Sequence, residues 1–128
     1  MALVLDSSAA VNVLLNAGTA RALVRDERLH APHLADSEVA SVLRRHVAAG
    51  RLSASHGHAA LGTWQRLGLR RHPATPVLAR IWELRGAVSA YDATYVALAE
   101  ALGCALVTAD GRLSRAPGLR CPVTVVPD

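Results

Sequence analysis

The chain has 128 residues, a length that suits one domain, so we expect a single domain over residues 1–128. Its composition, 52% hydrophobic and 19% charged, excludes a disordered or fibrous protein, and no uncharged stretch is long enough to cross a bilayer. All 14 basic residues are arginine, and the absence of lysine excludes Schiff-base catalysis and a lysine-based phosphate loop. The net charge of +4 is a weak indication of a polyanionic partner.

Short apolar runs alternate with longer helical patterns along the first half of the chain. Residues 2–5 are continuously apolar, as in a fully buried strand. Ser7 or Ser8 can cap the helix that follows, which Gly18 stops, and Thr19 can cap a short second helix. The most regular helix begins at Pro32 and ends at Gly50, with apolar residues at helical spacing between them. In chain order the expected elements are a strand at 2–5, helices at 7–17 and 19–24, a weaker strand at 29–31, and helices at 32–50 and 53–68.

The second half continues this alternation. Pro76 in a first turn favours a helix that includes Trp82, and Ser89 caps a helix that is apolar on two sides and therefore mostly buried. Pro122 cannot donate to a ladder, so the last strand is expected at an edge of the sheet. In chain order the expected elements are an extended piece at 69–72, helices at 75–86 and 89–103, a core strand at 104–107, a helical turn after 110 and a strand at 122–126. The pattern predicts an α/β fold with helices on both faces of a parallel sheet.

Four of the ten acidic residues occupy positions that bury or half-bury a charge: Asp6, Glu38, Asp92 and Asp110. Asp6 and Asp110 come at or just after the carboxyl ends of predicted core strands, where ligand sites form in open α/β sheets. Glu38 borders the apolar stripe of its helix, and Asp92 lies in the first turn of the mostly buried helix. We therefore expect the four carboxylates to converge on one edge of the sheet.

Each acid also has a purely structural explanation. Asp92 fits a capping box that the serine three residues earlier begins. The acids that follow the two strands can cap the next helices, and Glu38 can pair with Arg45 or lie half exposed. For each acid alone the structural explanation is favoured. For the four together it is less convincing, because acids that converge on one edge repel one another. Two carboxylates about 4 Å apart repel by about 4 kcal/mol at an effective dielectric of roughly 20. A divalent cation removes that repulsion, and hard oxygen ligands without His or Cys favour Mg²⁺ or Mn²⁺ over zinc.

Four segments resemble the acidic motifs of PIN-domain ribonucleases, and most closely those of the VapC toxin group. In chain order they are Val-Leu-Asp6-Ser-Ser8-Ala, Asp-Ser-Glu38-Val, Ser-Ala-Tyr91-Asp92-Ala-Thr-Tyr95 and Thr108-Ala-Asp110-Gly-Arg-Leu113. The resemblance runs essentially end to end, and its most specific parts are the Tyr-Asp-Ala-x-Tyr and Thr-x-Asp segments. It implies a three-layer α/β/α sandwich with a mostly parallel, Rossmann-like sheet.

The resemblance also implies an activity, that of a Mg²⁺-dependent endoribonuclease, with Mn²⁺ as a substitute, which acts as a toxin and is inhibited by a VapB-like antitoxin. The site residues that it implies are the catalytic and metal-binding acids, followed by two hydroxyls that orient the metal or its water: Asp6, Glu38, Asp92, Asp110, Ser8 and Thr108. One or two metal ions there lower the pKa of a bound water and neutralise charge on the phosphate. The family's habit points to a homodimer. The N-terminus lacks a secretory signal, so we expect a cytoplasmic protein with no membrane partner.

Arginines are the candidates for holding RNA, through phosphate contacts. Arg112 and Arg115 are favoured as RNA-binding residues because they immediately follow Asp110. Trp64 and Trp82 lie at helical spacing among Leu and Ile, so we expect both in the core and not against bases.

Three other functions stay open on the sequence alone. The same motifs are compatible with a housekeeping PIN nuclease in RNA maturation and with a catalytically silent RNA-binding protein of the same fold. A metal-independent ribonuclease, which activates the ribose 2′ hydroxyl, is disfavoured because none of the six His residues shows a partner pattern.

Overall fold

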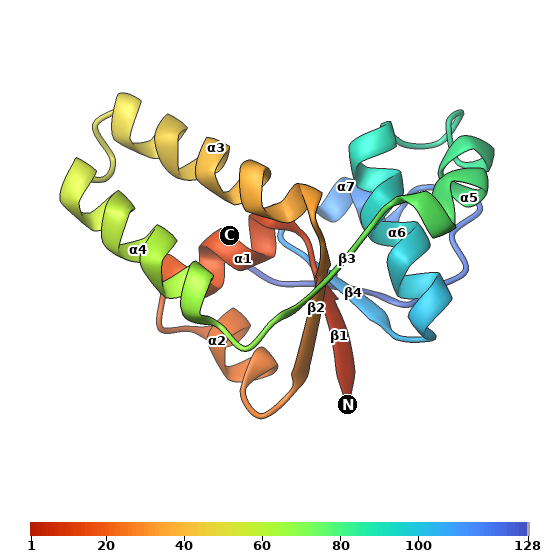
Figure 1. Ribbon diagram of the computed structural model, residues 1–128, viewed down its shortest axis with the longest axis horizontal. Helices are drawn as coiled ribbons and strands as arrows, with labels where there is room; N and C mark the ends of the chain where they lie inside the picture. The colour runs from red at the N-terminus through yellow and green to blue at the C-terminus, as the bar shows by residue number, and fades with distance from the viewer. Residues whose placement is uncertain (128) are drawn as a thin grey trace.

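The computed structural model describes residues 1–127 and contains a five-stranded parallel sheet with helices on both faces (Figure 1). The strands follow in the order β3-β2-β1-β4-β5, and every neighbouring pair is parallel. They are β1 (Ala2–Leu5), β2 (Arg28–Pro32), β3 (Arg70–His72), β4 (Ala105–Thr108) and β5 (Val123–Val125). The predicted α/β sandwich is confirmed, and β5 lies at an edge as Pro122 indicated.

Two layers of helices cover the sheet. The helices are α1 (Ser7–Leu15), α2 (Thr19–Val24), α3 (Leu34–Ala48), α4 (Ala54–Arg66), α5 (Leu78–Glu83), α6 (Ala90–Leu102) and α7 (Gly111–Ser114). A 3-10 turn, η1 (Thr75–Val77), precedes α5. Figure 1 shows α1 to α4 on one side of the sheet and α5 to α7 on the other. Within residues 1–127 no helix has both the length and the hydrophobicity that crossing a membrane requires.

Helix α6 is the central element of its layer. It packs on β1, β2 and β4, and its residues are buried from Ala93 to Ala99, as expected for a helix that is apolar on two sides. The hydroxyl of Ser89 caps its first turn, and Gly103 ends it in the left-handed conformation at φ 65°. These two signals fix the ends of α6 along the chain. Because α6 leads into the parallel strand β4, its first turn lies at the carboxyl edge of the sheet.

The helix expected at 75–86 is shorter and more exposed than predicted. The 3-10 turn η1 takes up its start, and α5 buries only Ile81 on the core side, followed by Leu84 at its end. Trp82 points away from that narrow stripe, because successive residues of a helix are rotated by about 100°. It is 68% exposed, with the Arg85 guanidinium 4.7 Å from the centre of its ring. The core prediction was therefore wrong for Trp82, whereas Trp64 is buried as expected.

Candidate active site

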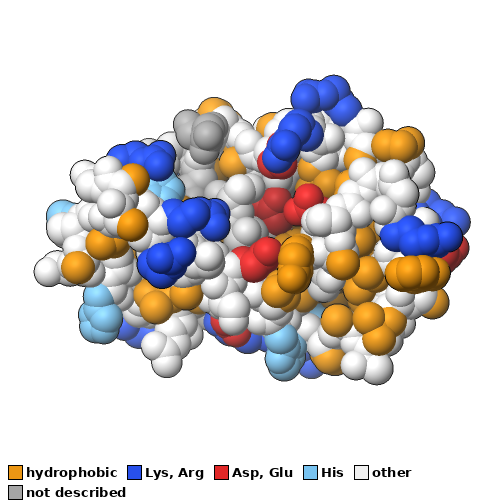
Figure 2. All heavy atoms as spheres, turned by 90° about the horizontal axis from the view of Figure 1, so that it is seen from above, with side chains coloured by type: hydrophobic (Ala, Val, Ile, Leu, Met, Phe, Trp, Pro, Cys, Tyr) orange, Lys and Arg blue, Asp and Glu red, His pale blue; other side chains and the backbone are white. Residues whose placement is uncertain are grey.

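The acids of the four sequence motifs reach the carboxyl edge of the sheet. β1 and β4 are neighbours with Leu5 opposite Val107, so the residues that follow these two strands emerge side by side. Asp6 directly follows β1, and its backbone N–H donates to the Val107 carbonyl at 3.0 Å. Figure 2 views the molecule from above this edge and shows acidic side chains near the centre, with arginines to either side. The strand order thus brings residues that are far apart in sequence to one place.

Asp6 is the most buried of the four acids, and three donors hold its carboxylate. Ser8 Oγ donates to Oδ1 at 2.6 Å, the Ala9 backbone N–H donates to the same oxygen at 2.9 Å, and Thr108 Oγ1 donates to Oδ2. Burial raises the pKa of Asp6, the three hydrogen bonds oppose the rise, and the negative charge of Asp92 adds to it. The fold therefore fixes this carboxylate in one orientation.

Ser8 and Thr108 connect the ends of β1 and β4. Their hydroxyl oxygens are 3.3 Å apart. Ser8 Oγ also accepts the backbone N–H of Ala109 at 2.9 Å, and Thr108 Oγ1 accepts that of Asp110 at 3.0 Å. Each hydroxyl thus donates to Asp6 while it accepts from the loop that carries Asp110. In the structure the two hydroxyls orient a carboxylate and position the next acid along the chain.

Glu38 reaches the same edge from α3, where Tyr95 of α6 holds it from the opposite face of the sheet. Tyr95 Oη donates to Glu38 Oε1 at 2.6 Å. Burial raises the pKa of Tyr95, and the bond to Glu38 and the charges of Glu38 and Asp6 raise it further. Sequence spacing did not identify this pair. The sequence feature that could have indicated the pair is the tyrosine hydroxyl on an otherwise apolar helix, because a buried tyrosine needs a hydrogen-bond partner for its O–H.

Tyr95→Phe is expected to lower the free energy of unfolding by about 1 kcal/mol, because it removes one hydrogen bond while keeping the ring in the core. It should also slow any cleavage that depends on the orientation of Glu38. Urea unfolding and an RNA cleavage assay measure the two effects. Tyr91→Phe is the matched control, since Tyr91 is 62% exposed and its variant should match the wild type in both assays. Equal losses in the two variants would contradict a role for the Tyr95 hydroxyl.

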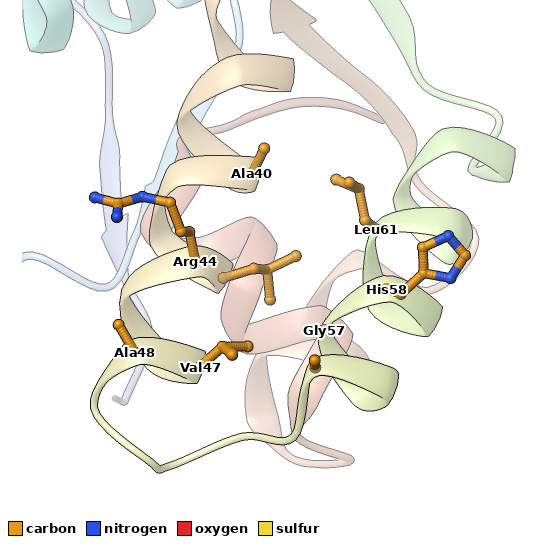
Figure 3. A pocket seen from close by; sticks show the side chains of 9 residues that line it. Ala40, Arg44, Val47, Ala48, Gly57, His58 and Leu61 are labelled. Atoms are coloured by element: carbon orange, nitrogen blue, oxygen red, sulfur yellow. The ribbon is translucent and has the colours of Figure 1, made fainter.

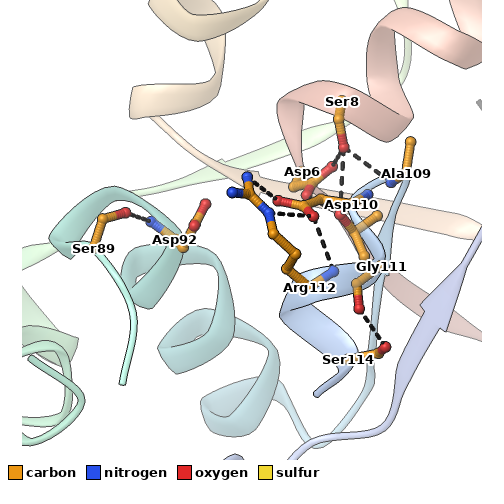
Figure 4. A network of polar contacts seen from close by, with 10 residues as sticks. Asp6, Ser8, Ser89, Asp92, Ala109, Asp110, Gly111, Arg112 and Ser114 are labelled. Carbon is orange, nitrogen blue, oxygen red and sulfur yellow. Dashed lines mark hydrogen bonds and ion pairs between the residues drawn. The ribbon is translucent and has the colours of Figure 1, made fainter. Parts of the chain in front are cut away.

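Asp92 and Asp110 line one hollow of about 260 Å³ at the starts of α6 and α7, and the guanidinium of Arg112 lies between them (Figure 4). Arg112 Nε donates to Asp110 Oδ1 and Arg112 Nη2 to Oδ2, each at 3.1 Å. These hydrogen bonds lower the pKa of Asp110, whereas burial and the charge of Asp110 raise the pKa of Asp92. The two carboxylates repel one another, and an arginine of the same chain offsets the repulsion.

Helix capping explains two of the four positions. Asp6 and Asp110 are the side-chain N-caps of α1 and α7, as the structural explanation predicted. α6 is capped by Ser89, whose Oγ accepts the backbone N–H of Asp92 at 3.1 Å. Ser89 therefore satisfies this helix start, and the carboxylate of Asp92 faces the hollow that it shares with Asp110.

The donor set fits a hard divalent cation in kind, because carboxylate oxygens are the ligands that Mg²⁺ and Mn²⁺ prefer. The acids do not surround a single point, however. Within residues 1–127 no three His, Cys, Asp or Glu side chains are close enough together to hold one metal ion. Hydroxyls, Tyr95 and Arg112 hold the carboxylate oxygens instead. The best-placed pair is Asp92 and Asp110, whose shared hollow already contains one cationic group.

Arg112 and Arg115 are both exposed on or beside α7, whereas another arginine is committed to the fold. Arg71 Nε donates to both carboxylate oxygens of Asp36 at 2.9 Å, and the guanidinium lies 5.6 Å from the centre of the Trp64 ring. The Trp64 indole N–H donates to the same carboxylate at 2.8 Å. Arg71 is thus part of a structural network on the α3 and α4 side of the sheet.

Two of the histidines form a pair that sequence spacing did not indicate. His30 Nδ1 and His72 Nε2 are 2.9 Å apart on the neighbouring strands β2 and β3. Burial, then the neighbouring imidazole and Arg70, lower the pKa of His30, and burial followed by Arg70 lowers that of His72. The expectation that no histidine has a partner was wrong for these two, because strand register and not sequence separation brings them together.

An apolar groove of about 350 Å³ separates α3 from α4 (Figure 3). Leu43 and Val47 line it from α3 and Leu61 lines it from α4, while Arg44 and His58 lie at its rim. None of the four motif acids lines this groove. It is therefore distinct from the acidic edge of the sheet.

Comparison with known proteins agrees with the motifs. The family model for the PIN domain matches residues 3–119. Ribonuclease VapC9 of Mycobacterium tuberculosis is 58% identical over 125 residues, which cover 98% of this chain and 98% of the relative. Ribonuclease VapC1 of the same organism is 41% identical over 128 residues, with 96% of each chain covered.

A solved structure shares the fold. The crystal structure of VapBC2 from Rickettsia felis, bound to a DNA fragment from its promoter, aligns with a TM-score of 0.73 over 98% of each chain at 12% identity. The resemblance that the acidic motifs indicated is confirmed over nearly the whole chain. This chain belongs to the PIN domain family, and within it to the VapC ribonucleases.

Proposed function

We propose that this chain is a toxin endoribonuclease that hydrolyses RNA phosphodiester bonds with water, using Mg²⁺ or Mn²⁺ held at the carboxyl edge of the sheet. The residues that would hold the ion are the four motif acids: Asp6, Glu38, Asp92 and Asp110. The observation that carries the proposal is the Asp92 and Asp110 pair, two repelling carboxylates in one hollow with a cationic group between them. The identity with VapC9 over nearly the whole chain supports RNA as the substrate.

A divalent cation, when bound, lowers the pKa of a water ligand and neutralises charge on the phosphate. The residues of the chain supply orientation and proton transfer. Ser8 and Thr108 act as positioning residues, because both donate to the carboxylate of Asp6. Asp92 and Asp110, which line the same hollow, are the candidate acceptors for the proton of the attacking water.

The products test this mechanism. Attack by water with departure of the 3′ oxygen leaves one fragment with a 5′ phosphate and the other with a 3′ hydroxyl. We expect these ends when a single-stranded RNA is cleaved, with mass spectrometry of the fragments as the measurement. A 2′,3′-cyclic phosphate would contradict the proposal, because it forms when the ribose 2′ hydroxyl is the nucleophile. Absence of cleavage on any RNA would favour a silent RNA-binding protein.

The charge distribution supports a polyanionic substrate. If the four acids bind metal, the remaining acids number 10 − 4 = 6 against 14 arginines, a formal balance of +8 outside the metal centre. Arg112 and Arg115 lie beside Asp110 and are the arginines that we propose contact RNA phosphates. This electrostatic contribution should weaken as salt rises, because binding releases counterions from the RNA.

Arg115→Gln is expected to weaken RNA binding uniformly across sequences, because a phosphate contact does not depend on the bases. Removing one phosphate contact should make the slope of log affinity against log salt shallower by about 0.7 on a single strand. Fluorescence anisotropy of a labelled single-stranded RNA in EDTA measures the slope. Arg85→Gln, in the exposed turn after α5, is the control and should leave the slope unchanged. The same slope in Arg115→Gln and the wild type would contradict the assignment.

We infer two partners besides RNA, a VapB-like antitoxin encoded beside this chain and a second copy of the chain in a cytoplasmic homodimer. Exposed Leu78 and Trp82 on α5 support the homodimer, since burying two large apolar side chains stabilises an association. Light scattering at micromolar concentration should give twice the mass of the chain, and a monomer would contradict this. Co-expression with the adjacent gene should relieve the growth arrest that the toxin alone causes.

A further inference from the structure

Arg112 occupies the position of a counter-cation between two acids of the candidate metal site. We propose that Arg112 neutralises Asp110 while no divalent cation is bound, releases it when the cation binds, and then faces the RNA backbone. This inference rests on the proposed function. It adds that binding of the metal frees the Arg112 guanidinium to contact an RNA phosphate. It assigns Arg112 a second role, as a competitor of the metal.

Both oxygens of Asp110 are engaged by Arg112. The Nε and Nη2 atoms each donate to one oxygen at 3.1 Å, and the backbone N–H of the same residue donates to Oδ1 at 2.9 Å. Figure 4 shows the guanidinium on the side of Asp110 that faces Asp92. A divalent cation between these two carboxylates would be next to a positive charge, and at such distances like charges repel strongly. The guanidinium and the cation therefore compete for one place.

The exposure of Arg112 allows it to leave. Its side chain is 85% exposed, and an ion pair exposed to this degree contributes little to stability. The Arg80 and Glu100 pair is a contrast, because these side chains are 16% and 11% exposed and Arg80 also donates to the Gly118 carbonyl at 2.7 Å. The Arg80 guanidinium thus bonds two separate segments of the chain, whereas within residues 1–127 the hydrogen bonds of the Arg112 guanidinium all end on Asp110.

Calorimetric titration with Mn²⁺ alone, at low ionic strength, tests the competition. In Arg112→Gln the Mn²⁺ dissociation constant should fall by about threefold to tenfold, because both the ion pair and a nearby positive charge are gone. Arg112→Lys keeps the charge but loses the two-pronged geometry, so its constant should lie between those of Arg112→Gln and the wild type. Arg115→Gln removes a charge from the same region without removing the ion pair, and it should change the constant much less.

A second readout follows Arg112 itself. In the wild type the ¹⁵N–¹H signal of the Arg112 Nε group should move during a Mg²⁺ titration and saturate at the Mg²⁺ dissociation constant that a parallel calorimetric titration gives. A signal that stays unchanged, or equal Mn²⁺ constants in the wild type, Arg112→Gln and Arg115→Gln, would overturn this inference and leave metal-dependent cleavage standing. Absence of Mn²⁺ binding in the wild type would contradict the proposed function as well, so the two failures are distinguishable.

Discussion

Asp6→Asn is expected to lower the rate of RNA cleavage by about 100-fold or more, because a neutral amide replaces the one carboxylate that the fold holds most firmly. Three donors fix the Asp6 carboxylate in one orientation at the end of β1. Initial rates on a single-stranded RNA with Mg²⁺ measure the loss. Asp26→Asn is the matched control, since Asp26 is exposed in the turn before β2 and its φ of 64° suits asparagine. A rate near that of the wild type in Asp6→Asn would contradict the role of this carboxylate.

The same substitution should leave the protein equally stable or more stable at neutral pH in EDTA. Burial raises the folded pKa of Asp6 above its ordinary value of 3.8, so the folded state favours the protonated acid. The stability that this group contributes is full below the unfolded pKa and is lost as the pH rises through the folded pKa. Asparagine does not titrate, so the advantage of Asp6→Asn should shrink as the pH falls from 7 towards 4. An advantage that grows on acidification would contradict the raised pKa.

Thr108→Val is expected to lower the free energy of unfolding by about 2 kcal/mol, because it leaves a buried acceptor and a buried donor without their partner. Thr108 is fully buried, and its hydroxyl donates to Asp6 and accepts the backbone N–H of Asp110. Cleavage should fall by about tenfold to 100-fold, as for residues that orient metal ligands. Urea unfolding in EDTA and initial cleavage rates are the measurements.

Thr94→Val is the matched control, because it shows what replacing a buried threonine by valine costs where the hydroxyl does not hold a site residue. Thr94 is also buried, but its hydroxyl donates only to the Ala90 carbonyl in its own helix, at 2.8 Å, so the loss should be about 1 kcal/mol or less. The destabilisation of Thr108→Val should grow between pH 4 and pH 7, because Thr108 stabilises the ionised form of Asp6. A pH-independent loss equal to that of Thr94→Val would show that Thr108 serves packing alone.

The order of the elements could be predicted from the sequence because local signals mark most of their ends. Ser89 and Gly103 placed α6 to within one residue, since a cap hydroxyl and a left-handed glycine are properties of the local chain. Trp82 was misplaced because periodicity identifies an apolar stripe but not how much of it a six-residue helix can bury. The His30 and His72 pair depends on strand order, which sequence spacing does not contain.

The four acids were identifiable from their positions, but their partners were not. Asp6 and Asp110 follow two neighbouring parallel strands, so the backbone alone places them at one edge of the sheet. The hydrogen bond from Tyr95 to Glu38 joins two helices on opposite faces of the sheet, and the fit of such a contact is decided only in three dimensions. The prediction that acids converge there is supported by the Asp92 and Asp110 pair, while binding of a metal by all four stays a proposal.

Cleavage of a single-stranded RNA by the wild-type protein, with and without a chelator, tests metal dependence most directly. With Mg²⁺ the protein should cleave, excess EDTA should stop cleavage while circular dichroism shows that the fold is kept, and added Mg²⁺ should restore it. Asp6→Asn, tested in parallel, should stay slower than the wild type by about 100-fold or more at every Mg²⁺ concentration. Cleavage that continues at full rate in excess EDTA would contradict a metal-dependent ribonuclease.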